Sequence, residues 1–118
     1  MELWAKTALT DAGWQNHVKV TVSDGVISSL VADHPPTGMN VGILLPAPVN
    51  LHSHAFQRAM AGLTEKRGPD GTDSFWTWRR LMYQFLAQLT PDDVEAITAF
   101  AQMEMLEAGF AHVGEFHY

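Results

Sequence analysis

The sequence predicts an α/β fold in which a small antiparallel β unit precedes a β–α–β unit with parallel strands. Two observations predict it: a strand and hairpin pattern near the N-terminus, and two apolar segments that flank a long stretch of helical patterns. Parallel strands need a long crossover connection, and the helical stretch supplies one. The chain has 118 residues, of which 47% are hydrophobic, so its length and composition fit one ordinary globular domain.

The antiparallel unit is predicted from residues 1–34. Residues 14–22 end in an alternation of polar and apolar side chains, which is typical of a half-buried strand. Asp24-Gly25 is a hairpin signal, and Val26–Val31 is the returning strand. Pro35-Pro36-Thr37-Gly38 then interrupts the strand pattern.

Two apolar segments are predicted to be parallel strands. Residues 43–49 form a continuous apolar run, which suits a strand buried on both faces, although its two prolines favour a short regular part. Residues 110–118 are interpreted as a second buried strand. Both faces of such strands need cover, so we expect the chain to be the N-terminal part of a longer protein. A small independent α+β domain is the alternative.

Helical patterns occupy the region between these segments. Residues 55–62 predict a helical turn or compact loop, and residues 65–72 predict an exposed polar loop. Asp73 or Ser74 is expected to cap a helix with a broad apolar stripe. Thr90 and Pro91 then begin a helix that runs to about residue 108 and ends at Gly109. Met103, Met105 and Leu106 are expected in the core.

Composition excludes several classes of function. The net charge of -6 argues against nonspecific binding to nucleic acid or to an anionic membrane. The absence of cysteine excludes disulfides and thiolate metal sites, so a metal would need histidine and carboxylate ligands. The first residues lack a signal-peptide pattern, and no apolar stretch approaches the roughly 20 residues of a membrane span. We therefore expect a cytoplasmic protein.

The tripeptide His52-Ser53-His54 comes after the first apolar run and is the leading candidate for a metal site. Residues i and i+2 of a strand point to the same face, so the two imidazoles are expected to converge on one point. Neutral imidazole is a common metal ligand. The alternative is a pair of polar residues in a turn.

Three blocks of sequence together resemble a known family. Residues 50–58 read NLHSHAFQR, residues 73–79 read DSFWTWR and residues 114–118 read GEFHY. In this combination they resemble the formimidoylglutamate deiminase family of the amidohydrolase superfamily, and the resemblance covers essentially the whole chain. It implies a (β/α)8 barrel with a small β-sandwich. Residues 1–45 would belong to the sandwich, and residues 46–118 would be the first βα units of a truncated barrel.

The resemblance also implies a site. His52 and His54 would be ligands of one divalent metal, Zn²⁺, and Gln57, Arg79 and Tyr118 would bind the carboxylates of N-formimino-L-glutamate. The implied reaction is hydrolytic deimination to N-formyl-L-glutamate and ammonia, in histidine degradation. The remaining ligands and all proton-transfer residues are expected after Tyr118, so no catalytic residue lies within this chain. The full-length protein is expected to be a homodimer.

Other interpretations of these residues stay open. Arg79 has rivals in Arg58 and Arg80, or is a surface arginine of an amphipathic helix, and Tyr118 is alternatively a core tyrosine. Glu115 and His117 are candidates to lie behind the site. His17, His34 and His112 are expected to be structural or exposed. The alternative functions are a deaminase of a heterocyclic amine, or a non-catalytic fragment.

Overall fold

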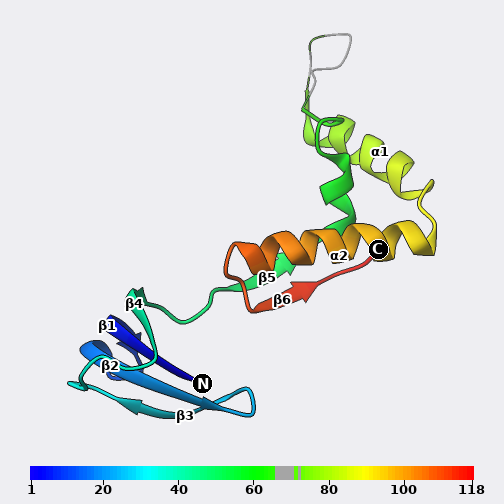
Figure 1. Cartoon of the computed structure of the whole chain (residues 1–118). Coiled ribbons are helices and arrows are strands. Elements are labelled where there is room, and N and C mark those ends of the chain that lie inside the picture. Colours follow the sequence, from blue (N-terminus) through cyan, green and yellow to red (C-terminus); the bar gives the residue numbers. More distant parts are fainter. Residues whose placement is uncertain (66–70, 72) are drawn as a thin grey trace. The chain divides into compact units, whose positions relative to one another are not determined.

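The computed structural model describes residues 1–65, 71 and 73–118, which fall into two compact units, Met1–Pro46 and Ala47–Tyr118 (Figure 1). Most of the polar loop predicted over residues 65–72 lies outside the described residues. Among the described residues, no helix combines the length and the apolar character that a membrane crossing requires.

The first unit is a four-stranded sheet with the order β3-β2-β1-β4. Its strands are β1 (Glu2–Thr10), β2 (Gly13–Ser23), β3 (Val26–Val31) and β4 (Met39–Leu44). Pairs β1–β2 and β2–β3 are antiparallel, whereas β4 joins β1 in parallel. The predicted hairpin is confirmed: Asp24 and Gly25 both have positive φ, 52° and 77°, as a two-residue hairpin loop requires.

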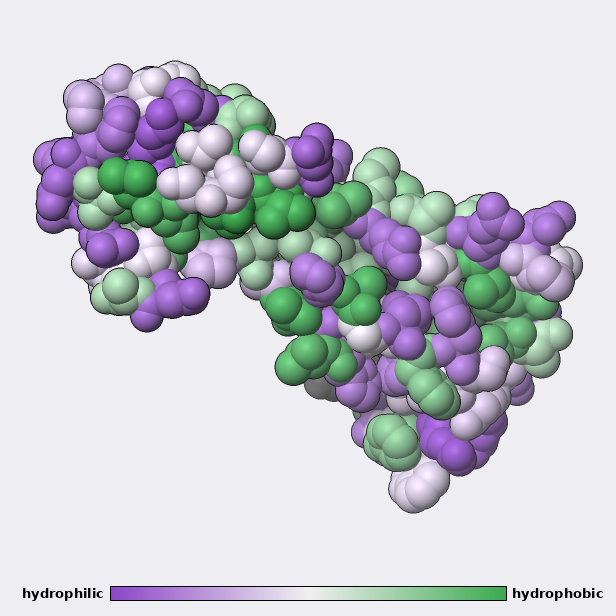
Figure 2. All heavy atoms as spheres, turned by 90° about the horizontal axis from the view of Figure 1, so that it is seen from below, coloured by the Kyte–Doolittle hydropathy of each residue, from purple (hydrophilic) through white to green (hydrophobic). Residues whose placement is uncertain are grey.

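The core of this sheet is small. It consists of Ala5 and Ala8 of β1 and Val18 and Val20 of β2, all at most 4% exposed. Every residue of β3 is exposed. Hydrophobic residues, green in Figure 2, are accordingly visible at the surface, and those of β3 are among the exposed ones.

The second unit contains a two-stranded parallel sheet whose strands are joined through helices. Its elements are β5 (Val49–Ser53), the 3-10 helix η1 (Ala55–Met60), α1 (Phe75–Leu86), α2 (Pro91–Glu107) and β6 (His112–Glu115). β5 pairs with β6 in parallel, so the predicted β–α–β unit is confirmed. Figure 1 shows α2 running alongside the strands, and Asn50 Nδ2 of β5 donates a hydrogen bond to Met105 Sδ of α2.

The helix ends agree with the predicted capping residues. Ser74 caps α1 by accepting a hydrogen bond from Thr77 N, and Thr90 caps α2 by accepting one from Asp93 N. At the end of α2, Gly109 has φ 91°, and Phe110 N donates to Met105 O at 2.9 Å. This Schellman arrangement turns the chain from α2 back toward β6.

Two strand predictions are wrong in their extent. Residues 43–49 are not one buried strand, because β4 ends at Leu44 in the first sheet and β5 begins at Val49 in the second. Most side chains of this run are exposed to solvent, including Ile43 at 68% and Val49 at 50%. The prolines at 46 and 48 lack the amide hydrogens that a sheet uses, so the run divides there. Similarly, residues 110–118 form a strand only over His112–Glu115, and most of this segment is exposed.

A small apolar cluster fixes η1 against α1. Phe56, Met60 and Met82 are each 2% exposed, and Trp78 and Phe85 pack beside them. Since η1 begins directly after His54, the cluster holds the chain in place just beyond the two histidines. On α2, by contrast, the expected burial is wrong for two of the three side chains, since Met103 is 45% and Leu106 69% exposed.

Candidate metal centre and substrate cavity

The two histidines of the predicted metal site face each other at the end of β5. Their Nε2 atoms lie 3.0 Å apart, and the ring planes are nearly perpendicular at 82°. Two imidazole nitrogens bound to one tetrahedral zinc ion at 2.0–2.1 Å lie about 3.3 Å apart. The observed separation therefore fits a shared metal ion after a shift of a few tenths of an ångström.

A backbone carbonyl orients His54 for this role. The Nδ1 atom of His54 lies 3.1 Å from Phe116 O, and a carbonyl can only accept a hydrogen bond, so Nδ1 carries the hydrogen. Nε2 is then left with its lone pair, which is the form that binds a metal. If the lone pair of His54 Nε2 is the acceptor, the 3.0 Å contact between the two Nε2 atoms is a hydrogen bond that His52 donates.

The described part of the chain supplies only these two ligands. No group of three or more His, Cys, Asp or Glu side chains able to hold a metal ion occurs among the described residues. A catalytic zinc site usually has three protein ligands and an open position. The pair therefore fits part of such a site.

One cavity joins all five predicted site residues. A hollow of about 490 Å³ is lined by His52, His54, Gln57, Arg79 and Tyr118. Aromatic and apolar side chains complete its wall, namely Phe75, Trp78, Met82 and Tyr83. The structure thus brings together residues from β5, η1, α1 and the segment after β6, which lie up to 66 positions apart in the sequence.

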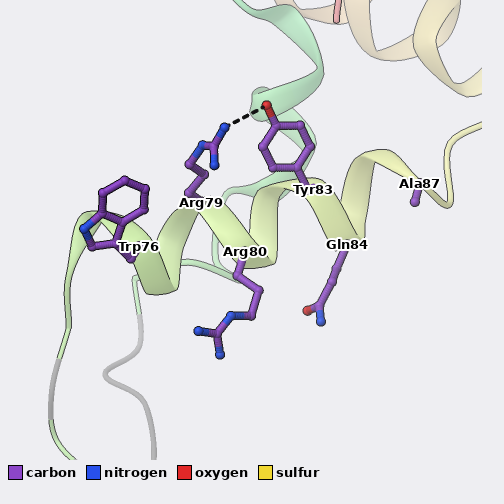
Figure 3. Close-up of a pocket in the computed structure, with 6 residues that line it drawn as sticks. All are labelled: Trp76, Arg79, Arg80, Tyr83, Gln84 and Ala87. Carbon is purple, nitrogen blue, oxygen red and sulfur yellow. Dashed lines mark hydrogen bonds between the residues drawn. The ribbon is translucent and has the colours of Figure 1, made fainter.

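Arg79 is held on α1 by the residue one turn further on. Its guanidinium lies 4.9 Å from the centre of the Tyr83 ring, and its Nη2 donates to Tyr83 Oη at a long 3.5 Å (Figure 3). Arg79 forms no ion pair within the described residues. Arg80, the next residue, does not line the cavity that contains the histidines. In Figure 3 its side chain points away from Tyr83.

Arg58, the other rival of Arg79, is already paired. It makes two hydrogen bonds to Glu104 of α2, and these raise the pKa of Arg58 and lower the pKa of Glu104. Arg58 also does not line the cavity that contains both histidines. The structure therefore favours Arg79 over both rivals as a cation at the cavity.

Gln57 and Tyr118 approach the cavity from different elements, η1 and the segment after β6. Gln57 Nε2 lies 3.5 Å from Met82 Sδ, a weak contact that leaves its amide oxygen available. The Tyr118 ring packs 5.0 Å from His54 and 5.5 Å from Phe56. Within this chain the side chain of Tyr118 is 54% exposed.

The remaining histidines and the acid on β6 differ in their surroundings. His17, His112 and His117 are exposed and His34 is half-buried. Glu115, in contrast, hydrogen-bonds to the backbone directly after His54. The sequence did not single out Tyr83, which lines the cavity and contacts Arg79. Its position four residues after Arg79 indicates this contact, because side chains at that spacing meet on one face of a helix.

Comparison with known proteins first defines the class. The structure superposes on a solved amidohydrolase from Brucella melitensis with a TM-score of 0.88 and 44% sequence identity, covering 99% of this chain and 26% of that one. The chain is thus similar to the amidohydrolases in both fold and sequence.

The sequence comparisons then narrow this class. Residues 2–40 match the family described as formimidoylglutamate deiminase HutF, N-terminal domain. A formimidoylglutamate deiminase of Pseudomonas aeruginosa is 47% identical over 98% of this chain, which corresponds to 26% of that protein. An 8-oxoguanine deaminase of the same organism is 32% identical over 64% of this chain and 16% of its own length.

These matches confirm the resemblance found in the sequence: the chain is related to the formimidoylglutamate deiminases. The chain spans about a quarter of the length of the formimidoylglutamate deiminase of Pseudomonas aeruginosa.

Proposed function

We propose that this chain is part of a zinc-dependent formimidoylglutamate deiminase, which hydrolyses N-formimino-L-glutamate to N-formyl-L-glutamate and ammonia in histidine degradation. One observation carries the proposal: a single cavity contains both a histidine pair suited to a metal and an arginine suited to an acidic substrate. The relative with 47% identity bears the name of this enzyme, which supports the same reaction.

Each residue of the cavity has a role that derives from its chemistry. His52 and His54 would hold the zinc ion through Nε2, together with ligands from the rest of the whole protein. When bound, zinc would supply Lewis-acid activation of water near neutral pH. Phe116 O keeps the proton of His54 on Nδ1 and so leaves Nε2 free to coordinate.

The substrate carries two carboxylates, and the cavity offers different partners for them. Arg79 is suited to a bidentate, charge-assisted pair with one carboxylate, assisted by the amide of Gln57. The hydroxyl of Tyr118 is suited to the other carboxylate. Trp78 and Phe75 give one wall of the cavity an apolar surface, and charged hydrogen bonds are stronger beside such a low-dielectric surface than in bulk water.

The fold of the whole protein belongs to the same proposal. Residues 46–118 would form the first βα units of a (β/α)8 barrel, and residues 1–45 would form part of a small β-sandwich. In such barrels the functional groups lie at the carboxyl ends of strands, and His52 lies at this end of β5 while His54 directly follows the strand. The proposed protein is cytoplasmic and homodimeric, and binds neither nucleic acid nor membrane.

A deaminase of a heterocyclic amine is the second candidate, and the similarity to 8-oxoguanine deaminase favours it. The two candidates differ in the charge of their substrates. An acidic substrate needs the cation of Arg79, whereas a neutral ring does not. The third possibility, a chain without catalytic activity of its own, concerns the isolated polypeptide and is compatible with the first.

The test measures ammonia release by the whole protein from N-formimino-L-glutamate and from a neutral purine. Arg79→Ala is expected to lower kcat/KM for N-formimino-L-glutamate by about 10- to 100-fold, because a charged hydrogen bond contributes about 1.5–3 kcal/mol. Arg80→Ala is the matched control and should change kcat/KM less than about 3-fold. Equal activity of Arg79→Ala and wild type, or preference for the purine, would reject the proposed substrate.

A further inference from the structure

The end of β6 holds the histidine turn through three hydrogen bonds. Phe116 N donates to Ser53 O at 2.9 Å, and His54 Nδ1 donates to Phe116 O at 3.1 Å. Ala55 N donates to Glu115 Oε1 at 2.8 Å. Two adjacent residues at the end of β6 therefore contact every residue from Ser53 to Ala55, about 60 positions earlier in the chain.

Only one of these three contacts depends on the identity of a side chain at the end of β6. Phe116 acts through its backbone, which any residue would supply. Glu115 acts through its carboxylate, and η1 has neither a capping hydrogen bond from His54 nor an acidic residue in its first turn. Glu115 thus satisfies the first free amide of η1, at the residue directly after His54.

The carboxylate of Glu115 is set into this position rather than lying on the surface. Its Oε2 atom is buried and has no hydrogen-bond partner among the described residues. Its neighbour Gly114 passes so close to β5 that an added Cβ would lie 3.1 Å from Leu51 O. The backbones of β5 and β6 are therefore in close contact at the residue next to Glu115.

We propose that Glu115 is a positioning residue for the metal ligand His54. By accepting the hydrogen bond of Ala55 N, its carboxylate fixes the backbone after His54 and keeps His54 Nε2 directed at His52 Nε2. This inference rests on the proposed metal binding by the histidine pair. Residues that orient metal ligands without touching the metal typically change metal affinity or activity by about 10- to 100-fold when removed.

The experiment uses the whole protein and three replacements of Glu115. Glu115→Gln keeps an acceptor oxygen at the same distance along the side chain, Glu115→Asp withdraws it by one methylene, and Glu115→Ala removes it. Glu95→Ala, an exposed acid on α2, is the control. Zinc affinity is measured by competition with a chromogenic chelator, kcat and KM by ammonia release, and the thermal midpoint on metal-free protein.

We expect Glu115→Ala and Glu115→Asp to lower zinc affinity by about 10- to 100-fold, and kcat more than KM. Glu115→Gln should restore zinc affinity to within about 3-fold of wild type, because its amide oxygen accepts from Ala55 N. A residue that only supported the fold would lower the thermal midpoint of the metal-free protein and leave the zinc affinity of the folded protein unchanged.

Three results would overturn the inference. The first is wild-type zinc affinity in Glu115→Ala, and the second is a loss in Glu115→Gln as large as in Glu115→Ala. If Glu115→Ala does not fold, equal zinc affinities of the Gln and Asp variants overturn it as well. A wild-type protein that binds no zinc would refute the proposed function itself. An active wild type, together with Glu115 variants that keep the wild-type zinc affinity, would refute only the role of Glu115.

Discussion

The side chains of Arg58 and Glu104 join η1 to α2 through two parallel hydrogen bonds, from Nε to Oε2 at 2.6 Å and from Nη2 to Oε1 at 2.8 Å. The guanidinium also lies 5.2 Å from the centre of the Phe100 ring. This arrangement is bidentate and fixes the orientation of both partners. It anchors the helical turn after the histidine pair to α2.

The first prediction concerns the pH dependence of stability. The pKa of Glu104 lies below its ordinary value of 4.5 because Arg58 donates hydrogen bonds to the carboxylate. The pair therefore stabilises the folded state above the unfolded pKa, and this contribution is lost as pH falls through the lower, folded pKa. Glu104→Gln should show a flatter fall in stability in this acidic window.

The expected difference is small, because the two side chains are 42% and 39% exposed and water screens their interaction. Urea unfolding of wild type and Glu104→Gln between neutral and acidic pH measures it. The control is Glu95→Gln on the same helix, which should keep the wild-type slope. If stability falls with pH equally in wild type and in Glu104→Gln, the pair of Arg58 and Glu104 contributes nothing to the pH dependence.

The second prediction concerns the close approach of β5 and β6. An added Cβ on Gly114 would lie 3.1 Å from Leu51 O and 3.4 Å from Leu51 C, and these backbone atoms cannot rotate away. Gly114→Ala should therefore destabilise the protein by about 1–3 kcal/mol, as overpacking does. Because β6 holds the histidine turn, zinc affinity should fall as well.

Gly42→Ala is the matched control for Gly114→Ala. Gly42 also lies in a strand, but nothing stands within 4 Å of the position of its added Cβ. Its replacement should change stability by less than about 0.5 kcal/mol. Urea denaturation compares the two variants, and equal stabilities would mean that the strands separate without cost.

The third prediction concerns the apolar cluster of η1 and α1. Phe56 is 2% exposed, packs against Met60 and Met82, and contacts the Tyr118 ring. Phe56→Ala should destabilise the protein by about 3–5 kcal/mol through lost burial and the cavity left behind. Leu63→Ala, at a position 57% exposed, should cost about 0.5 kcal/mol. Urea denaturation measures the stability of both variants. Similar losses of stability in the two would contradict the packing of Phe56 in this cluster.

The local structure was predictable wherever short-range chemistry decides it. The Asp24-Gly25 hairpin, the caps at Ser74 and Thr90, and the end of α2 at Gly109 all depend on residues within one or two turns. The convergence of His52 and His54 was expected from the two-residue period of a strand. Each of these signals comes from neighbouring residues.

The failures concern burial and contacts between distant residues. The apolar run over residues 43–49 predicted one buried strand, yet hydrophobicity alone does not say which sheet a strand joins. Leu106 was expected in the core, but its side chain is 69% exposed. Glu115 was a candidate to lie behind the site, but its hydrogen-bond partner Ala55 is 60 positions away, and no local pattern indicates that partner.

The fourth prediction concerns the metal ligands. His52→Ala or His54→Ala in the whole protein should lower zinc affinity by more than about 100-fold, beyond the 10- to 100-fold typical of residues that only orient ligands. His112→Ala is the control, since His112 is exposed on β6. Chelator competition measures the affinities. Wild-type affinity in either ligand variant would exclude that histidine from the site.

The last prediction separates the ring of Tyr118 from its hydroxyl. The ring packs against His54 and Phe56, so Tyr118→Phe should leave stability unchanged. The lost hydroxyl should raise KM for N-formimino-L-glutamate by about 10-fold, because a hydrogen bond to a charged group contributes about 1.5–3 kcal/mol. Tyr83→Phe is the matched control: it keeps the ring under Arg79 and loses only the 3.5 Å contact, so KM should change less than about 3-fold. An unchanged KM in Tyr118→Phe would remove Tyr118 from the substrate site and leave Arg79 and Gln57 as the carboxylate partners from this chain.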